Sequence, residues 1–514
     1  MGRLMCARTI VLSFAVLLAS LSTGCGGMPT RIPPTPTAKP TEAASITVRW
    51  VLPGEVQDGS DAVWAEANRL VAAKLPNTTL EIIPYAFDTY ADRTKLMIAA
   101  GEDFDIMWAS DWLGDYIGKV NGGAFQPIDV LMDQYAPQLE TFLPAWMLQA
   151  GQLNGRLYGL LNYQQLWRAF GIVTRDSIAA KYGLDMAGFE TDSANRNLES
   201  IDVLRNDLEP FFAKALADTS KSEIYILNTT GLAETVLYRD LEPIYSVGSI
   251  EKFVDRDLKI LNTYKTRAYK DLLTLAADWY DKGYIRKDVI TAQSNLTIDE
   301  RKQYVMEIGN SGSPEDFDIE LSTAFGEPTS GSRFTPIYVP YNAGAATMNF
   351  INAKSKNPDR AIQVLEQVNT DVRIYNTLVF GVEGVQYTIQ PDVASDVVPM
   401  KAIEGSPTYG LYDWVIGSVA NSWGRYAEYI DYRFTKWNNQ APKSVLFGFR
   451  PVTTTIADQI TKCNSVLQEY NYLTSGADKD YLKHYDEFIA ALDAAGAEDI
   501  IFELQKQVDA FLKE

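Results

Sequence analysis

The stretch ITVRWVLPG, residues 46–54, is central to the fold class because it predicts a buried β-strand that ends in a Pro-Gly turn. An alternation of elements continues from it along the chain, predicted as helix 61–75, strand 79–83, helix 90–100 and strand 105–108. Strands that alternate with helices in this way predict an open α/β sheet. Ligands of such sheets bind beyond the carboxyl ends of the strands, and Ser110-Asp111-Trp112 follow the third strand directly.

Further along, the pattern predicts more elements of both kinds. Strands are expected at 303–308, 335–340 and 345–351, and the sequence GNSG at 309–312 is expected to form an open loop after the first of them. Asn357 and Pro358 predict the start of a helix, with Asn357 as its N-cap. Apolar stripes over 482–492 and 501–511 predict two final helices, with Gly496 ending the first.

The first residues predict the compartment. The apolar, uncharged run 10–21 is shorter than the about 20 residues that span a bilayer, and it matches the central region of a secretory signal. Cys25 follows small residues, as in a bacterial lipobox, where the Cys thiol receives a diacylglycerol, although Leu21 lies one position farther from the Cys than usual. An ordinary signal-peptidase site with an incidental Cys25 is the alternative. We expect a signal peptide over 1–24, lipidation of Cys25 and a Pro- and Thr-rich tether over 25–45, which together anchor the protein outside the cytoplasm, on the cell membrane.

The composition excludes several classes of function. The net charge of −20 disfavours nucleic acid and anionic lipid as partners. His484 is the only histidine, so neither a zinc site built on several histidines nor a Ser-His-Asp triad is possible. Cys463, on a predicted helix, is expected to be a small buried residue. The sequence has no phosphate-binding glycine motif, and we expect neither a cofactor nor enzymatic activity.

Motifs spread over most of the chain carry a family resemblance. They are GEDFDI (101–106), NGRLYG (154–159), NAKSKNP (352–358), GVEG (381–384, before Tyr387) and the final region 447–512. In this order, behind Cys25 and its tether, they resemble the extracellular solute-binding proteins of ABC sugar importers, particularly the long lipoprotein group of Gram-positive bacteria. Residues 180–330 match that group least.

The resemblance implies an α/β fold of two lobes, periplasmic-binding-protein-like (type II), joined by a hinge that the chain crosses near Asn162, Pro340 and Gln390. Lobe one would comprise 46–161 plus 340–390, and lobe two 162–339 plus 391–514. A small-molecule ligand would bind in the cleft between them and close the lobes by hinge bending. The closed, monomeric protein would then dock on the permease subunits of an ABC transporter in the membrane.

A sugar site needs aromatic rings for the apolar ring faces and polar side chains for the hydroxyls. No basic cluster is visible in the sequence, which favours a neutral ligand, an oligosaccharide in particular. We expect ligand contacts from residues at strand ends and hinge crossings, namely Trp108, Asp111, Trp112, Asn162, Gln164, Trp167, Asn310, Asn342, Trp414, Asn421 and Trp423. For each polar residue in this set, turn or cap chemistry is an equal alternative.

Two other functions remain open at this stage. A membrane-anchored carbohydrate-active enzyme would need two carboxylates facing each other across a cleft, for which Glu102, Asp103 and Asp105 are candidates by proximity alone. The same fold could instead serve as a ligand receptor for a sensor kinase. Sequence does not separate sugar from peptide as the ligand.

Overall fold

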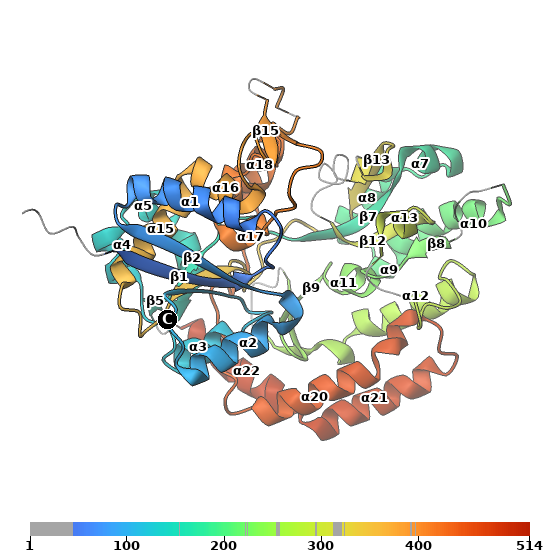
Figure 1. Ribbon diagram of the computed structural model, residues 1–514. Coiled ribbons are helices and arrows are strands. Elements are labelled where there is room, and N and C mark those ends of the chain that lie inside the picture. Colours follow the sequence, from blue (N-terminus) through green and yellow to red (C-terminus); the bar gives the residue numbers. More distant parts are fainter. Residues whose placement is uncertain are drawn as a thin grey trace, which may run out of the picture. The chain divides into compact units, whose positions relative to one another are not determined.

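The predicted α/β sheet is present in the computed structural model, which describes residues 45–513 except 154, 221–222, 224, 253–257, 293–295, 312–320, 323, 391–392 and 396. Its five strands lie in the order β2-β1-β3-β14-β6. β1 runs parallel to both β2 and β3, whereas β14 runs antiparallel to both of its neighbours (Figure 1). The strands are β1 (Ile46–Pro53), β2 (Thr78–Tyr85), β3 (Ile106–Ala109), β6 (Gly159–Leu161) and β14 (Met348–Ile351).

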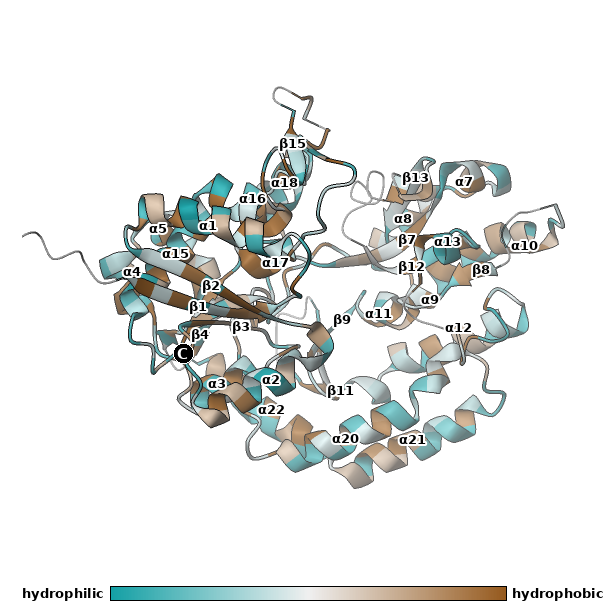
Figure 2. Cartoon of the chain, in the orientation of Figure 1, coloured by the Kyte–Doolittle hydropathy of each residue, from teal (hydrophilic) through white to brown (hydrophobic). Residues whose placement is uncertain are grey.

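Apolar side chains of this sheet and of the helices on it form one core. Val48, Trp50, Val51 and Leu52 of β1 are buried in it. The helices carry both hydrophobic and hydrophilic residues (Figure 2). Gly101 ends α2 in the left-handed conformation, with a φ of 68°, as its position after the apolar run predicts. The contributing helices are α1 (Ser60–Lys74), α2 (Phe87–Ala100), α3 (Tyr116–Asn121), α4 (Asp129–Tyr135), α5 (Gln138–Phe142), α15 (Pro358–Thr370), α16 (Val372–Phe380) and α17 (Asp413–Ile416).

A second large core forms around a four-stranded sheet with the order β13-β7-β12-β8. The strands are β7 (Ala169–Arg175), β8 (Tyr225–Asn228), β12 (Tyr304–Ser311) and β13 (Thr329–Arg333). The helices are α7 (Asp176–Tyr182), α8 (Met186–Ala194), α9 (Ser200–Val203), α10 (Glu209–Ala217), α11 (Leu232–Leu237), α12 (Arg267–Asp281), α20 (Ala457–Glu469), α21 (Tyr481–Ala495) and α22 (Ala497–Phe511). Cys463 is fully buried on α20, and Gly496 separates α21 from α22, as predicted.

Shorter elements connect these parts. The small strands are β4 (Gln152–Leu153), β5 (Arg156–Leu157), β9 (Leu241–Tyr245), β10 (Gly248–Glu251), β11 (Leu261–Asn262), β15 (Tyr387–Ile389) and β16 (Met400–Ala402). The short α-helices are α6 (Ala145–Leu148), α13 (Ile298–Arg301), α18 (Ala427–Ile430) and α19 (Asn438–Gln440). Single 3-10 or π turns are η1 (Gln149–Gly151), η2 (Leu204–Leu208), η3 (Thr263–Lys265), η4 (Val419–Asn421), η5 (Asp431–Trp437) and η6 (Asn471–Ser475).

Three local predictions were wrong: a strand at 335–340, an open loop at Asn310 and a helix cap made by the Asn357 side chain. Residues 335–340 form no strand, because Pro336 and Pro340 lack the N–H that a ladder needs, and only isolated bridges form at Tyr338 and Val339. Asn310 lies inside β12, opposite Phe170, and not in an open loop. The glycine before it permits close backbone packing against Gly231.

At the start of α15 the chain takes the predicted turn without the predicted cap. Asn357 occupies the N-cap position, but its side chain makes no capping hydrogen bond. Pro358 stands at the first turn, where its missing N–H costs nothing. The helix start is therefore confirmed, and the role given to the Asn357 side chain is wrong.

Several predictions concern residues outside the described part of the chain. The signal segment, Cys25 and all of the tether but Ser45 lie there. Ser45–Glu514 groups as one compact unit that contains both large cores. In the residues that the structure describes, no helix combines the length and the apolar character needed to cross a membrane.

Candidate ligand-binding site

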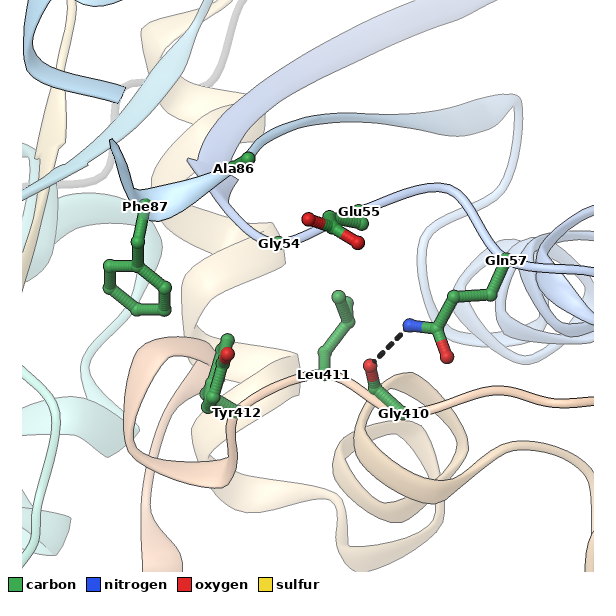
Figure 3. A pocket seen from close by; sticks show the side chains of 8 residues that line it. All are labelled: Gly54, Glu55, Gln57, Ala86, Phe87, Gly410, Leu411 and Tyr412. Atoms are coloured by element: carbon green, nitrogen blue, oxygen red, sulfur yellow. Dashed lines mark hydrogen bonds between the residues drawn. The ribbon is translucent and has the colours of Figure 1, made fainter. Parts of the chain in front are cut away.

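The carboxyl ends of β1, β2 and β3 meet at one edge of the first sheet, because the three strands are parallel. A hollow of about 380 Å³ lies at this edge. Figure 3 shows the ring of Phe87 beside that of Tyr412 on one side and Gln57, whose amide donates to the Gly410 carbonyl at 2.6 Å, on the other. The full lining is Gly54, Glu55, Gln57, Ala86, Phe87, Gly410, Leu411 and Tyr412.

Four aromatic side chains, which we call the Trp112 platform, continue from this hollow: Phe87, Trp112, Tyr412 and Trp414. The ring centroids of Phe87 and Tyr412 are 4.8 Å apart, and Trp112 lies 6.1 Å from Phe87 and 6.0 Å from Trp414. The Trp112 side chain is 56% exposed and Tyr412 is 47% exposed, which is unusual for such large apolar groups. Exposed aromatic rings at a sheet edge offer stacking surfaces for the apolar face of a sugar.

The loop that carries Trp112 is held rigidly. Ser110 and Leu113 close a tight turn, because the Ser110 backbone N–H donates to the Leu113 carbonyl at 2.9 Å and the Leu113 N–H donates to Ser110 Oγ at 2.8 Å. The indole N–H of Trp112 donates to the Ala346 carbonyl at 2.9 Å. Its polar atom is therefore satisfied within the protein, and its ring remains available to a ligand.

Asp111 directly precedes Trp112 of the platform. Its carboxylate accepts a hydrogen bond from the Asn342 amide at 2.6 Å. Solvent reaches Asp111, yet the surrounding protein desolvates its carboxylate and raises its pKa, while Asn342 and the charges of Arg168 and Arg450 act in the opposite direction. Its carboxylate oxygens are hydrogen-bond acceptors beside the platform.

Asn342 also lines a second, smaller cavity of about 30 Å³. Two cations, Arg168 and Lys252, stand on its wall together with the buried carboxylate of Glu242. Burial lowers the pKa of Lys252 to about 8, although the charge of Glu242 opposes this shift. The other lining residues are Phe170, Tyr238, Pro243, Thr335, Tyr338 and Pro340.

Five of the eleven sequence-predicted site residues come together here: Trp108, Asp111, Trp112, Asn342 and Trp414. Trp108 is fully buried behind the platform, 5.9 Å from Trp112 and 5.8 Å from Trp414 between ring centroids. Its indole N–H donates to Thr347 Oγ1 at 2.7 Å. In this structure Trp108 supports the platform from below and offers no surface to a ligand.

The other six residues are placed elsewhere or carry structural contacts. Asn162 is fully buried, and its amide donates to the carbonyls of Trp414 and Val415. Trp167 is buried and donates to the Arg433 carbonyl at 3.0 Å. Trp423 packs against Tyr387, and Asn421 donates to the Asn369 carbonyl at 2.7 Å.

Gln164 and Asn310 belong to the same six. Gln164 is half-buried, and its backbone carbonyl accepts from the Asn438 amide at 2.8 Å. Asn310 is part of β12, as described above. These two residues carry no observation that brings them to the Trp112 platform.

Sequence reasoning missed Phe87, Tyr412, Arg168 and Lys252. Phe87 starts α2 just after β2 ends at Tyr85, so the strand-end argument that selected Trp112 would have found it. The other three offer no such signal, because chain segments far apart in sequence bring them to the site.

Asp103 and Asp105, two of the three acids that sequence offers for an enzyme, lie at the other end of the sheet. Asp103 pairs with Arg49 at 2.9 Å, and Asp105 accepts from Ser355 Oγ at 2.5 Å. Both precede the first residue of β3, whereas the platform follows its last residue. The expectation that these acids lead into a strand is confirmed. In the described ranges, no three His, Cys, Asp or Glu side chains are grouped so that they could hold a metal ion.

Solved structures define the class of fold. A solute-binding protein for N-glycan transport (NgtS) from Streptococcus pneumoniae superimposes with a TM-score of 0.75 at 21% identity, covering 91% of this chain and 99% of that one. A structure of the same protein in complex with Man5GlcNAc gives a TM-score of 0.65. The chain has the α/β fold of the solute-binding proteins of ABC importers, as its motifs predict.

Sequence relatives agree with this class. A carbohydrate ABC transporter substrate-binding protein of Streptococcus pneumoniae serotype 4 is 23% identical over 472 residues, 90% of each chain. The lipoprotein LipO of Bacillus subtilis is 24% identical over 209 residues, 40% of this chain and 38% of that protein. Residues 445–513 match the model of a domain of unknown function, DUF3502. The first of these relatives, which matches along nine tenths of the chain, is thus a substrate-binding protein of an ABC transporter.

Proposed function

We propose that this chain is the extracytoplasmic substrate-binding subunit of an ABC importer and that it captures an oligosaccharide on the Trp112 platform. The observation that carries the proposal is the group of four aromatic rings beyond the carboxyl ends of β1, β2 and β3, of which Trp112 and Tyr412 are exposed. Asp111 and Asn342 supply hydrogen-bonding groups beside the rings. The named ligands of the relatives, carbohydrates and N-glycans, support the choice of an oligosaccharide.

The two large cores support a division into two lobes. One core is built on the first sheet and the other on the second. Leu411, Val415 and Ile416, which sequence places in lobe two, pack into the core of the first sheet. We therefore propose lobes that follow the cores, with the chain passing between them near Asn162, Pro340 and a third point after Ile416. The permease subunits of the importer are the proposed partners of the monomer.

The experiment is a thermal-shift screen against oligosaccharides of defined length, including Man5GlcNAc. A ligand that binds only the folded state at 100 times its Kd adds about 2.7 kcal/mol to the free energy of unfolding and raises the Tm. The ligand should also be recovered intact after long incubation. Cleavage of the oligosaccharide, lost in a variant of the platform, would instead identify a carbohydrate-active enzyme.

Anchoring by Cys25 is a separate proposal, supported by the small residues before it and by the likeness to a lipoprotein. Replacement Cys25→Ala should move the protein from the membrane fraction into the medium of an expressing Gram-positive host. Replacement of the buried Cys463 by Ala serves as the matched control, because it removes a thiol without touching the lipobox. Equal membrane fractionation of the wild type and Cys25→Ala would contradict the anchor.

A further inference from the structure

The smaller cavity beside Asn342 is too small for a sugar ring, but it is large enough for a substituent of such a ring. Its volume is about 30 Å³, and one water molecule needs at least about 10–15 Å³ on the same kind of measure. A group as large as one or two water molecules, such as a carboxylate, fits this space. The hydrogen bond from Asn342 to Asp111, next to Trp112, connects the cavity to the platform.

Arg168 stands on the wall of this cavity, and its charge also acts on the Asp111 carboxylate. Its backbone is fixed, because its N–H donates to the Tyr338 carbonyl at 2.8 Å and its carbonyl accepts from the Tyr338 N–H at 3.1 Å. Its side chain is exposed and has neither an ion pair nor a hydrogen bond with any of the described residues. A guanidinium presented in this way matches the two oxygens of a carboxylate.

Lys252 approaches the same cavity and is only partly satisfied. Its ammonium donates to the Tyr238 carbonyl at 2.7 Å and lies 4.8 Å from the centre of the Tyr338 ring. Desolvation and the charges of Arg196 and Arg168 disfavour its protonated form, whereas Glu242 and Asp240 favour it. An added anion in the cavity would relieve this cost.

Two cations and one acid stand on the cavity wall itself. Glu242 is the one acid on the wall, and its carboxylate already accepts hydrogen bonds from Tyr338 Oη at 2.8 Å, the Tyr341 N–H at 2.6 Å and Ser444 Oγ at 2.8 Å. Arg168 and Lys252 oppose it, so the wall holds one positive charge in excess. Farther out, the cations Arg196 and Arg450 stand against the acids Asp111, Glu234 and Asp240, so the excess positive charge is confined to the wall.

We propose that the cavity between Arg168 and Lys252 receives a carboxylate of the ligand, so that the captured oligosaccharide carries an acidic sugar of the uronic or sialic acid class. The ring of this sugar would lie outside the cavity, toward Asp111 and the Trp112 platform. This proposal rests on the proposed function and replaces the expectation of a neutral ligand. Sequence could not show the two cations together, because β7 and the segment after β10 bring them to one place.

The test uses two acidic probes and their matched neutral forms. Oligosaccharides that end in glucuronic acid or in N-acetylneuraminic acid are titrated calorimetrically, each beside the same compound with its carboxyl reduced to a primary alcohol. At least one acid should bind about tenfold or more tightly than its reduced form, because hydrogen bonds between charged groups exceed neutral ones. If neither acid exceeds its reduced form, the proposal is overturned.

Variants locate the effect. Arg168→Gln and Lys252→Met should each lower the affinity for the acid toward that of the reduced form and leave the affinity for the reduced form nearly unchanged. Arg69→Gln, on the exposed face of α1, is the matched control for a lost charge. Equal weakening of acid and reduced form would overturn the proposal, and so would an unchanged preference for the acid in both variants.

The same data separate this proposal from the proposed function. Binding of Man5GlcNAc or another neutral oligosaccharide, with no preference for either acid, would leave the importer subunit intact and reject the carboxylate site. Failure of every oligosaccharide in the screen, neutral and acidic, would reject both. Arg168 is exposed, so Arg168→Gln should fold. It therefore tests the proposal even if Lys252→Met, at a half-buried residue, does not fold.

Discussion

At the scale of the residue, Trp108 and Trp112 show which properties of a side chain the sequence can predict. Both follow from the rule that ligands bind at strand ends, and both lie at the site. Burial separates them: Trp108 is completely covered, whereas more than half of Trp112 is exposed. This difference depends on Thr347, Ala346 and Trp414, which pack against the two rings from distant segments, so no local pattern could predict it.

The two tryptophans therefore predict opposite phenotypes. Trp112→Ala should weaken oligosaccharide binding about tenfold, since a stacking contact and its buried area are lost, and should leave the Tm of the free protein within about 1–2 °C. Trp108→Ala should lower the free energy of unfolding by about 3–5 kcal/mol, because it opens a cavity in the core. Ligand titration and thermal melts of both variants check this. Unchanged binding by Trp112→Ala would contradict the site.

Lys252 gives the binding of an acidic sugar a pH dependence. Its pKa of about 8 is lowered by desolvation, so the ammonium is charged at pH 7 and loses its proton as the pH rises. The charges that face Lys252 are those of Arg168 and Arg196, which disfavour its protonated form, and those of Glu242 and Asp240, which favour it. Affinity for the acidic probe should therefore fall between about pH 7 and pH 9. The reduced probe and the Lys252→Met variant should both show a flat profile; a fall in either would contradict the assignment.

At the scale of the element, local patterns predicted regular structure well and its interruptions poorly. The elements from β1 to β3 and the two final helices follow from apolar periodicity and capping residues. The prolines interrupt the strand predicted at 335–340, and the glycine before Asn310 predicts a turn where the structure has a strand. That glycine instead permits close contact with Gly231, a long-range cause that the local sequence does not reveal.

Asn162, which the sequence predicts as a ligand contact, instead connects secondary-structure elements. At the end of β6 its amide donates to Thr347 Oγ1 and to two carbonyls of α17, and its oxygen accepts from the Asn349 amide at 2.9 Å. It joins β6, β14 and α17 below the platform. We expect a stabilising role, and ligand contact at this fully buried residue has no support.

Asn162→Ala should lower the free energy of unfolding by about 1–3 kcal/mol or more, because buried carbonyls lose their donor. Thermal melts and denaturant titrations measure this loss. Gln164→Ala is the matched control: its half-buried side chain makes no hydrogen bond with the described residues, so its melt should match that of the wild type. An unchanged melt for Asn162→Ala would show that water replaces the amide without cost.

At the scale of the whole molecule, the family motifs predict the fold, whereas the site depends on contacts between residues far apart in the sequence. Asp111 reaches Asn342, and Trp112 reaches Ala346 and Trp414, across long stretches of chain. Trp414, which sequence assigns to lobe two, packs against the core of the first sheet. Sequence therefore gave the class of molecule and part of the platform, whereas the cationic cavity required the folded structure.

At this scale we propose that the ligand closes the two lobes by hinge bending. The Trp112 platform packs on the core of the first sheet, whereas Tyr238, beside Arg168 and Lys252 on the cavity wall, packs against the core of the second. A ligand that touches only the platform, or only the cavity wall, binds the open and closed forms equally. Such a ligand shifts no equilibrium, however tightly it binds. Contact with both the platform and the cavity wall supplies the difference in affinity that closure requires.

We therefore expect a saturating oligosaccharide to reduce the radius of gyration of the wild type in small-angle X-ray scattering. Arg168→Gln, with the ligand raised to saturate it, should show a smaller reduction, because the ligand then remains on the platform with weaker contact to the opposite wall. Arg69→Gln should compact as the wild type does. Full compaction of Arg168→Gln, or none in the saturated wild type, would contradict a closure that depends on both walls.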